Sequence, residues 1–319
     1  MVNTTLLKCG EDWYYTLASM RNGRPVTEEH ISGSSDIDLR STVDLVELIN
    51  DEDARVPGAV RGAAQPLAAA IDAIVERLER GGRLIYVGAG SSGRLALVDA
   101  AECGPTFGIP PGQVIALVAG GPTALAVAQE AAEDDDVAGA RDLAEADVAE
   151  RDAVVLLSAS GGTPYVVGAA GTAREAGALT VAVVCADESE LGRLADHQVS
   201  VVVGPEVIAG STRMKAGTAQ KLVLNTISTV AMVRLGKTYG NLMVDVVASN
   251  EKLRGRARRA VEIATGAEEA EVDAALESSS GDVKVAIVSL LAGLDAAGAR
   301  TRLAAAGGVV RRALEQDPV

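Results

Sequence analysis

Two short segments of the chain combine hydroxyl groups with glycines just after an apolar run. The first follows LIYVG (84–88), and the second follows VVLL (154–157). A helix that begins at such a turn offers free backbone N–H groups and the positive end of its dipole, and hydroxyls add donors. The segments predict a phosphate site, unless the serines only cap their helices. The candidate residues are Gly90, Ser91, Ser92, Gly93, Ser158, Ser160, Gly161 and Thr163.

Gly88, Gly90 and Gly93 also fit the GxGxxG pattern of dinucleotide-binding proteins. That interpretation requires an acidic residue at the end of the second strand, where it would bind a ribose hydroxyl. Here the second strand ends in VAGGP (118–122), which contains no acid. The residues therefore favour a single phosphate ester over a dinucleotide.

A third candidate anion site lies at the start of a long helix predicted from 211 to 235. Ser211, Thr212, Arg213 and Lys215 bring two hydroxyls and two cations to that start. Such a group suits a phosphate or a carboxylate. The alternative is ordinary capping by Ser211, with Lys215 in solvent.

The elements that must position these residues are read from an alternation of apolar and helical segments. Runs of Val, Ile and Leu occur at 83–88, 113–120, 152–160, 178–185 and 197–204, and helical stretches such as 163–177 lie between them. Continuous apolar runs suit strands buried on both faces, and strand–helix alternation predicts a parallel sheet between two helical layers. Earlier segments predict a helix after Ser41 and another over 58–80.

The pattern divides the chain into three parts. Residues 1–40 form an irregular leader, 41–249 an α/β domain, and 250–319 a small C-terminal helical module. Hydroxyl loops at the carboxyl ends of parallel strands lie where such sheets bind ligands.

Composition limits the partners. The formal net charge is −15, which argues against nucleic acid and against anionic membranes. Three scattered cysteines and two histidines predict neither a disulfide framework nor a zinc site. No secretory signal or membrane-spanning run is recognised, so a cytoplasmic location is expected.

Several longer stretches together resemble the N-acetylmuramic acid 6-phosphate etherase family. They are GAGSSGRLALVDAAECGPTFG, AEDDD, SASGGTPYV, PEVIAGSTRMKAGTAQKLVLN and RLGKTYGNLMVDVVASNEKL. The resemblance runs from about residue 27 to the C-terminus and implies a fold of the sugar isomerase (SIS) type. It also implies cleavage of a D-lactyl ether by elimination and water addition, giving N-acetylglucosamine 6-phosphate and D-lactate, without a metal or redox cofactor.

The resemblance assigns catalysis to Glu102 in AECGPTFG and to Glu133 in AEDDD. Elimination needs a base for the carbon 2 proton and an acid for the leaving oxygen, and two carboxyl groups can share these roles. Glu102 is expected within one or two turns of the phosphate loop. Without the resemblance, both would be read as surface glutamates.

Three departures leave the substrate open. His30, Ile31 and Ser32 replace the family's usual Arg-Asn-Pro, Gly162 replaces an arginine, and Gly104 replaces a proline. The alternatives are a related lyase or isomerase acting on another phosphorylated sugar, and a non-catalytic sugar-phosphate-binding regulator. A homodimer is expected, because domains of this type often complete their sites across an interface.

Overall fold

A computed structural model of the chain describes residues 8–9, 12–13, 20–21, 24–29, 31, 36–246 and 251–315. Much of the predicted leader, including His30 and Ser32, lies outside the described residues. The described parts of that region contain only short elements. These are β1 (Lys8–Cys9), β2 (Asp12–Trp13), β3 (Met20–Arg21), β4 (Arg24–Pro25), η1 (Val26–Glu28) and η2 (Ile37–Leu39).

A parallel sheet of five strands forms the centre of the fold, as the apolar runs predict. Its order is β6-β5-β7-β8-β9. Leu84 pairs with Val114 on one side and with Ala153 on the other. The strands are β5 (Leu84–Gly88), β6 (Val114–Val118), β7 (Ala153–Leu157), β8 (Leu179–Val184) and β9 (His197–Ser200).

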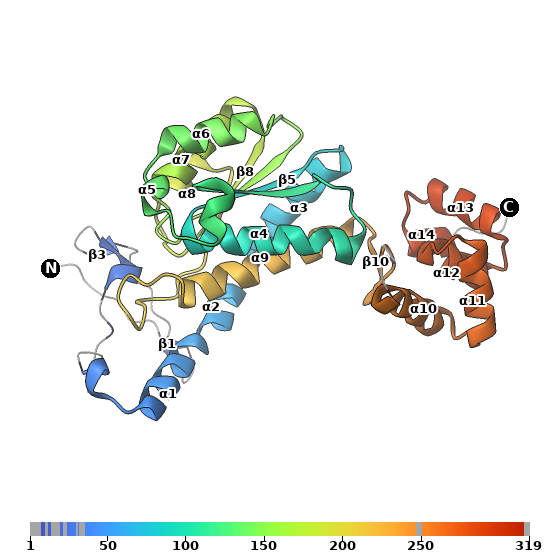
Figure 1. The fold of residues 1–319 in the computed structure, drawn as a ribbon, viewed down its shortest axis with the longest axis horizontal. Coiled ribbons are helices and arrows are strands. Elements are labelled where there is room, and N and C mark those ends of the chain that lie inside the picture. The colour runs from blue at the N-terminus through green and yellow to red at the C-terminus, as the bar shows by residue number, and fades with distance from the viewer. Residues whose placement is uncertain are drawn as a thin grey trace.

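Helices cover both faces of this sheet, so the predicted three-layer architecture is confirmed (Figure 1). On β5, Leu84 and Tyr86 face one layer, while Ile85 and Val87 face the other. The first layer contains α3 (Ala64–Glu79), α4 (Gly90–Phe107) and α9 (Lys215–Arg234). The second contains α6 (Asp136–Glu145), α7 (Pro164–Glu175) and α8 (Glu190–Leu194).

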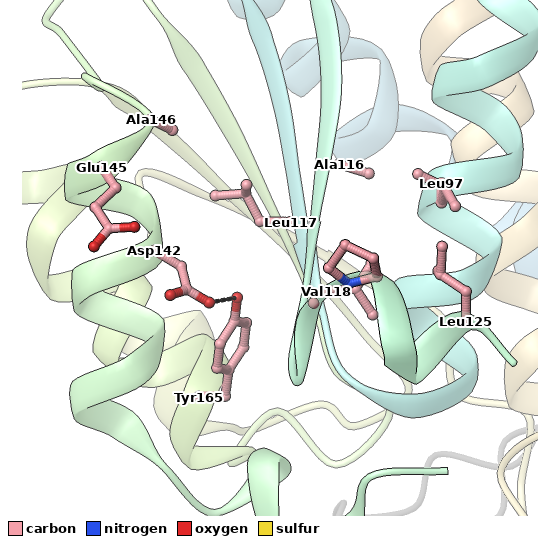
Figure 2. A pocket seen from close by; sticks show the side chains of 11 residues that line it. Leu97, Ala116, Leu117, Val118, Leu125, Asp142, Glu145, Ala146 and Tyr165 are labelled. Carbon is pink, nitrogen blue, oxygen red and sulfur yellow. Dashed lines mark hydrogen bonds between the residues drawn. The ribbon is translucent and has the colours of Figure 1, made fainter. Parts of the chain in front are cut away.

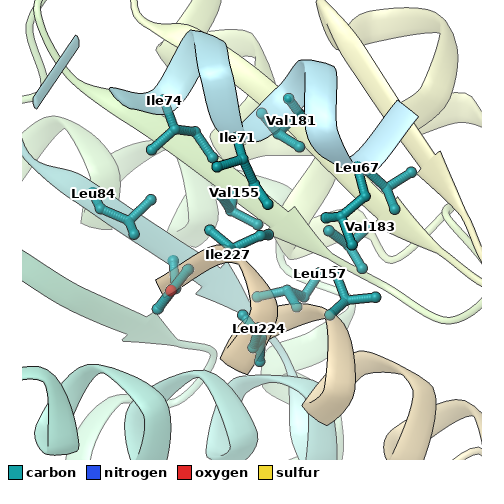
Figure 3. Close-up of a cluster of buried hydrophobic side chains, with 14 of the residues drawn as sticks. Leu67, Ile71, Ile74, Leu84, Val155, Leu157, Val181, Val183, Leu224 and Ile227 are labelled. Atoms are coloured by element: carbon teal, nitrogen blue, oxygen red, sulfur yellow. The ribbon is translucent and has the colours of Figure 1, made fainter. Parts of the chain in front are cut away.

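The first layer holds the larger group of buried apolar side chains. Figure 3 shows side chains from α3, such as Ile71, meeting Val155 and Val181 of the sheet and Leu224 and Ile227 of α9. Aliphatic side chains fill this core, because the chain has very few aromatic residues.

The strand order creates a crevice at the carboxyl ends of the neighbouring strands β5 and β7. The chain passes from β5 to β6 on one side and then returns to β7 on the other side of β5. Helix α4, which follows β5, and helix α7, which follows β7, therefore start on opposite faces at neighbouring strand ends. Open parallel sheets bind ligands at such a switch point.

Two predicted helices differ in their limits. The helix expected over 58–80 is divided into α2 (Val56–Gly62) and α3, and the helix expected from Ser211 begins at Lys215. The helix expected after Ser41 is α1 (Thr42–Asp53), and Ser41 caps it by accepting a hydrogen bond from the Asp44 N–H at 3.2 Å.

The C-terminal helices pack around a separate cluster of buried side chains. They follow the hairpin of β10 (Thr238–Tyr239) and β11 (Leu242–Met243). Asp245, just after this hairpin, pairs with Lys237 at 3.1 Å and with Lys284 at 2.6 Å. The helices are α10 (Glu251–Thr265), α11 (Glu269–Ser278), α12 (Val283–Ala292), α13 (Ala296–Ala305) and α14 (Val310–Glu315).

Helices α6 and α7 pack so closely that the backbone of one contacts the backbone of the other. A side chain on Gly139 would overlap the carbonyl group of Tyr165, and one on Gly168 would overlap that of Asp136. The first residues of α6 are therefore held against α7, the helix that follows the hydroxyl loop at 158–163.

Among the described residues, none of the helices combines the length and the apolar character that a membrane span requires. The described His, Cys, Asp and Glu side chains form no group of three or more that could hold a metal ion.

We predict that Gly168→Ala lowers the free energy of unfolding by about 1–3 kcal/mol, because its methyl group has no space between α6 and α7. The matched control is Gly171→Ala in the same helix, where no atom lies within 4 Å of the added methyl group. That control should gain about 0.4–1 kcal/mol. Equal stabilities of the two variants in urea unfolding would contradict this packing.

Candidate active site

A cavity of about 400 Å³ lies in the crevice between the starts of α4 and α7. It collects both hydroxyl loops and the segment before α9, which are far apart in the sequence. Seven of the candidate binding residues line it: Gly90, Ser91, Ser92, Ser160, Thr163, Ser211 and Thr212.

The start of α4 is the part of this cavity best suited to an anion. Gly90, with φ of +51°, opens the helix, and Ala89 before it makes no side-chain capping bond. Among the described residues, no carboxylate or hydroxyl caps the first N–H groups of α4, so these groups are available to a phosphate.

Three other candidate residues do not line the cavity. Gly93 lies against the backbone of Gly88, where a side chain would overlap. Gly161, with φ of +72°, turns beside Ser189. The Ser158 hydroxyl contacts that of Thr163 at 2.8 Å and accepts from the Gly161 N–H at 2.9 Å. These residues shape the loops behind the cavity wall.

The prediction that Lys215 contributes to an anion site is wrong. Its side chain is 1% exposed, and its Nζ pairs with Glu52 of α1 at 2.5 Å. The start of α9 is also occupied, because the Glu206 carboxylate accepts from the N–H groups of Lys215 and Ala216 at 3.0 and 2.9 Å. Ser211 and Thr212 instead precede the helix and reach the cavity from their loop.

Two arginines supply the positive charge of the cavity. Arg213 follows Thr212 in the loop, and Arg94 lies one turn into α4, where its Nε donates to the carbonyl of Ala124 at 2.9 Å. The sequence pattern indicated Arg213 beside Lys215 but assigned no role to Arg94. The position of Arg94, four residues after Gly90 and on the same side of the helix, could have revealed it.

Glu133 lies in this cavity. It ends the short helix α5 (Glu130–Glu133), and its carboxylate lies so close to the start of α4 that a methyl group on Gly90 would come within 2.5 Å of its Oε1. Burial and the negative charges of Asp134 and Glu130 raise the pKa of Glu133, and Arg94 opposes the shift. A carboxyl group with a raised pKa is suited to holding and releasing a proton.

Glu102 lies elsewhere. It is exposed, is not among the residues that line the cavity, and is twelve residues after Gly90 on α4. At the rise of an α-helix this places it about 18 Å along the axis from the helix start. The expectation that Glu102 lies within one or two turns of the phosphate loop is therefore wrong for a single chain.

The sequence departure at Gly162 can be placed relative to the cavity. Gly162 is exposed beside Ser160, and no atom lies within 4 Å of the position that its Cβ would take. The loop can therefore carry a side chain there without rearrangement. Thr27, which lines the cavity and accepts from the Gly210 N–H at 2.9 Å, precedes the changed segment at 30–32 by three residues.

A second cavity of about 400 Å³ lies beside the edge strand β6, and Figure 2 shows its lining. Leu97, Leu117 and Leu125 make it largely apolar, and the Tyr165 hydroxyl donates to Asp142 at 2.9 Å on its far side (Figure 2). The described residues that line it include carboxylates but no cation, and no α-helix starts there. We therefore place the candidate active site at the strand ends.

Two families of protein domains match parts of the chain. Residues 66–173 match the glucokinase regulatory protein N-terminal SIS domain, and residues 135–229 match the SIS domain. Among solved structures, a phosphoheptose isomerase from Francisella tularensis is 15% identical, with a TM-score of 0.46, over 61% of this chain and all of that one. The phosphoheptose isomerase GmhA from Neisseria gonorrhoeae is 18% identical, with a TM-score of 0.46, over 60% and 98%.

Curated relatives match nearly the whole chain. The N-acetylmuramic acid 6-phosphate etherase of Rubrobacter xylanophilus is 59% identical over 92% of this chain and 97% of its own length. The proteins of the same name from Streptomyces coelicolor and Salmonella agona are 54% and 51% identical. They cover 88% and 93% of this chain, and 90% and 100% of their own lengths.

Proposed function

The chain belongs to the N-acetylmuramic acid 6-phosphate etherase family, and we propose that it cleaves the D-lactyl ether of N-acetylmuramic acid 6-phosphate. It is a carbon–oxygen lyase whose products are N-acetylglucosamine 6-phosphate and D-lactate. The identity of 59% over 92% of the chain carries this conclusion, and the cavity at the strand ends supports it. The cytoplasmic location stays a prediction.

The phosphate of the substrate binds at the start of α4. Free N–H groups, the helix dipole and the hydroxyls of Ser91 and Ser92 converge there, and Ser160 and Thr163 face them from the second loop. Arg94 and Arg213 add positive charge for the phosphate or for the lactyl carboxylate. The start of α9 takes no part, because Glu206 already occupies it.

The reaction consists of an elimination followed by an addition of water, and each of these steps needs two proton transfers. Once the sugar ring opens to its aldehyde, a carboxylate removes the carbon 2 proton, the bond from carbon 3 to the ether oxygen breaks, and a carboxylic acid protonates the departing lactate oxygen. Water then adds to carbon 3 of the unsaturated aldehyde, and carbon 2 regains a proton. Glu133, with its raised pKa, is one of the two carboxyl groups, and Glu102 is the other.

We predict that the wild type releases D-lactate from N-acetylmuramic acid 6-phosphate and that Glu133→Gln and Glu102→Gln each lower kcat by about 10²–10⁴-fold. An amide cannot exchange the proton that either step requires. The control is Glu175→Gln on the exposed end of α7, which should keep wild-type activity.

A folded wild type without lactate release would contradict the proposal. Turnover of another sugar phosphate would then support the related lyase or isomerase. Tight binding without any turnover would support the regulator.

The distance between the two glutamates leads to the proposed homodimer. Glu102 and Glu133 of one chain cannot act on one substrate if Glu102 lies about 18 Å from the start of α4. A second copy that packs against α4 can supply the missing carboxyl group, and the exposed face of α4 is suited to such packing.

This face has Val98 at its centre. Val98 is 61% exposed, and Leu125 and Val127, in the segment after β6, are 39% and 62% exposed. Positions four residues apart share a helix face, so Arg94 and Glu102 lie on either side of Val98. Leu97, the residue before Val98, lines the apolar groove beside β6 together with Leu125 (Figure 2).

Antiparallel packing of two α4 helices across a two-fold axis at Val98 places the partner subunit's Glu102 opposite Arg94. Arg94 lines the cavity and acts electrostatically on Glu133. The opposite charges of Arg94 and Glu102 favour this register. Each site of the dimer would then contain Glu133 from one chain and Glu102 from the other.

We predict that Val98→Asp weakens the dimer at least about 10-fold, because a carboxylate at the centre of an apolar interface loses its hydration. Its activity per chain should fall with dissociation and return at high protein concentration. Val137→Asp, at a 71% exposed valine on α6, is the matched control and should change neither property. Analytical ultracentrifugation beside the lactate assay measures both, and a fully active Val98→Asp monomer would exclude this arrangement.

A further inference from the structure

The buried Gln220 side chain lies behind the wall of the active-site cavity. It is on α9, is 2% exposed, and its Oε1 accepts a hydrogen bond from the Ser92 hydroxyl at 2.8 Å. Its Nε2 is the one buried side-chain nitrogen or oxygen that lacks a hydrogen-bond partner among the described residues. A buried N–H group without an acceptor is costly, so this position requires an explanation.

A half-turn of the amide group removes much of that cost. The terminal torsion of a glutamine is soft, so the side chain can adopt either amide orientation. After the half-turn, Nε2 donates to Ser92 Oγ, and the unpartnered position holds a carbonyl oxygen. Proteins tolerate an unpaired buried carbonyl oxygen more readily than an unpaired N–H group.

The two orientations have opposite consequences for Ser92. While Oε1 faces Ser92, the serine hydroxyl donates its hydrogen to Gln220, and only the lone pairs of the serine oxygen are available to the cavity. Once Nε2 faces Ser92, the serine accepts from Gln220, and its own proton is available to a ligand at the start of α4.

We propose that Gln220 is a positioning residue that makes Ser92 a hydrogen-bond donor to the phosphate of the substrate. The inference rests on the proposed function, because it takes a sugar phosphate as the ligand of the cavity. Gln220 does not touch that ligand and acts only through the direction of the Ser92 hydroxyl.

Gln220 is not needed to join the two helices. Further along the same pair, Asp99 of α4 accepts hydrogen bonds from Asn225 at 2.6 Å and from Ser228 at 3.0 Å, and also from Tyr86 at 2.8 Å. This buried network already ties α4 to α9 and to the sheet. The Gln220 contact adds a single hydrogen bond, to a residue that lines the cavity.

The test is a double-mutant cycle between Gln220 and Ser92, measured as the affinity for N-acetylglucosamine 6-phosphate by titration calorimetry. Ser92→Ala should weaken binding about 10-fold, the effect of one hydrogen bond to a charged group. Gln220→Met, similar in size but without a polar amide, should weaken binding several-fold in the wild type and not at all in Ser92→Ala. Additive losses, or a Gln220→Met effect on thermal unfolding alone, would overturn the inference.

Gln220→Glu gives a second, independent reading. An ionised carboxylate can only accept a hydrogen bond, so it uses the Ser92 O–H as its donor. Because burial raises the pKa of a carboxyl group, binding is measured at a pH high enough to ionise it, and Gln220→Glu should then weaken binding more than Gln220→Met does. Gln65→Glu, at an exposed position of α3, controls for the added charge. Equal affinities of the Gln220→Glu variant and the wild type would overturn the inference.

The binding readout separates this inference from the proposed function. A wild type that binds N-acetylglucosamine 6-phosphate and shows the cycle, but releases no lactate, would contradict only the proposed reaction. A wild type that binds neither this product nor inorganic phosphate would overturn the role of Gln220 as well.

Discussion

The straight course of α4 is the constraint on which the site depends. The helix begins at the end of β5, inside the cavity, and is fixed against α9 by the contacts of Asp99 with Asn225 and Ser228. An α-helix held in this way cannot fold back toward its own start. It presents free N–H groups to a phosphate at one end and carries Glu102 about 18 Å away. The phosphate site therefore belongs to one chain, while the proposed pair of carboxyl groups requires two.

Local charges explain how a chain with a net charge of −15 can bind an anion. Arg94, Arg213 and the start of α4 face the cavity. Lys215, which follows Ser211, Thr212 and Arg213 in the sequence, does not contribute its charge there. Lys215 is buried in an ion pair with Glu52, and Glu206 satisfies the N–H groups at the start of α9. Removing one partner of a buried ion pair is strongly destabilising, so these contacts hold the loop before α9 in place.

Much of the fold could be predicted because its signals are local. Runs such as AVVLL over β7 can be buried only in a sheet covered on both faces, and the glycines and serines after β5 indicate the turn into α4. The contacts that decide the site are not local. Glu52 lies 163 residues before Lys215, so no nearby residue shows that this lysine is already paired.

The error on Glu102 has a different physical cause. Its motif is close in sequence to the phosphate loop, but an intervening helix carries the side chain away from that loop. A helix converts each residue of separation into 1.5 Å along one direction, so twelve residues are too many. Ser91, Ser92 and Arg94, at the start of α4, are the side chains of this helix that line the cavity. At the rise of an α-helix, Arg94 lies about 6 Å and Glu102 about 18 Å along the axis from Gly90.

The measurement that tests the shared site most directly is the activity of hybrid dimers. Inactive Glu102→Gln and Glu133→Gln chains are mixed, unfolded and refolded together, and lactate release is compared with that of each variant refolded alone. If each site takes its two glutamates from different chains, every mixed dimer has one complete site. About a quarter of wild-type activity should then return, because half of the dimers are mixed. No recovery in dimers shown to be mixed would contradict a site completed by the partner subunit's Glu102.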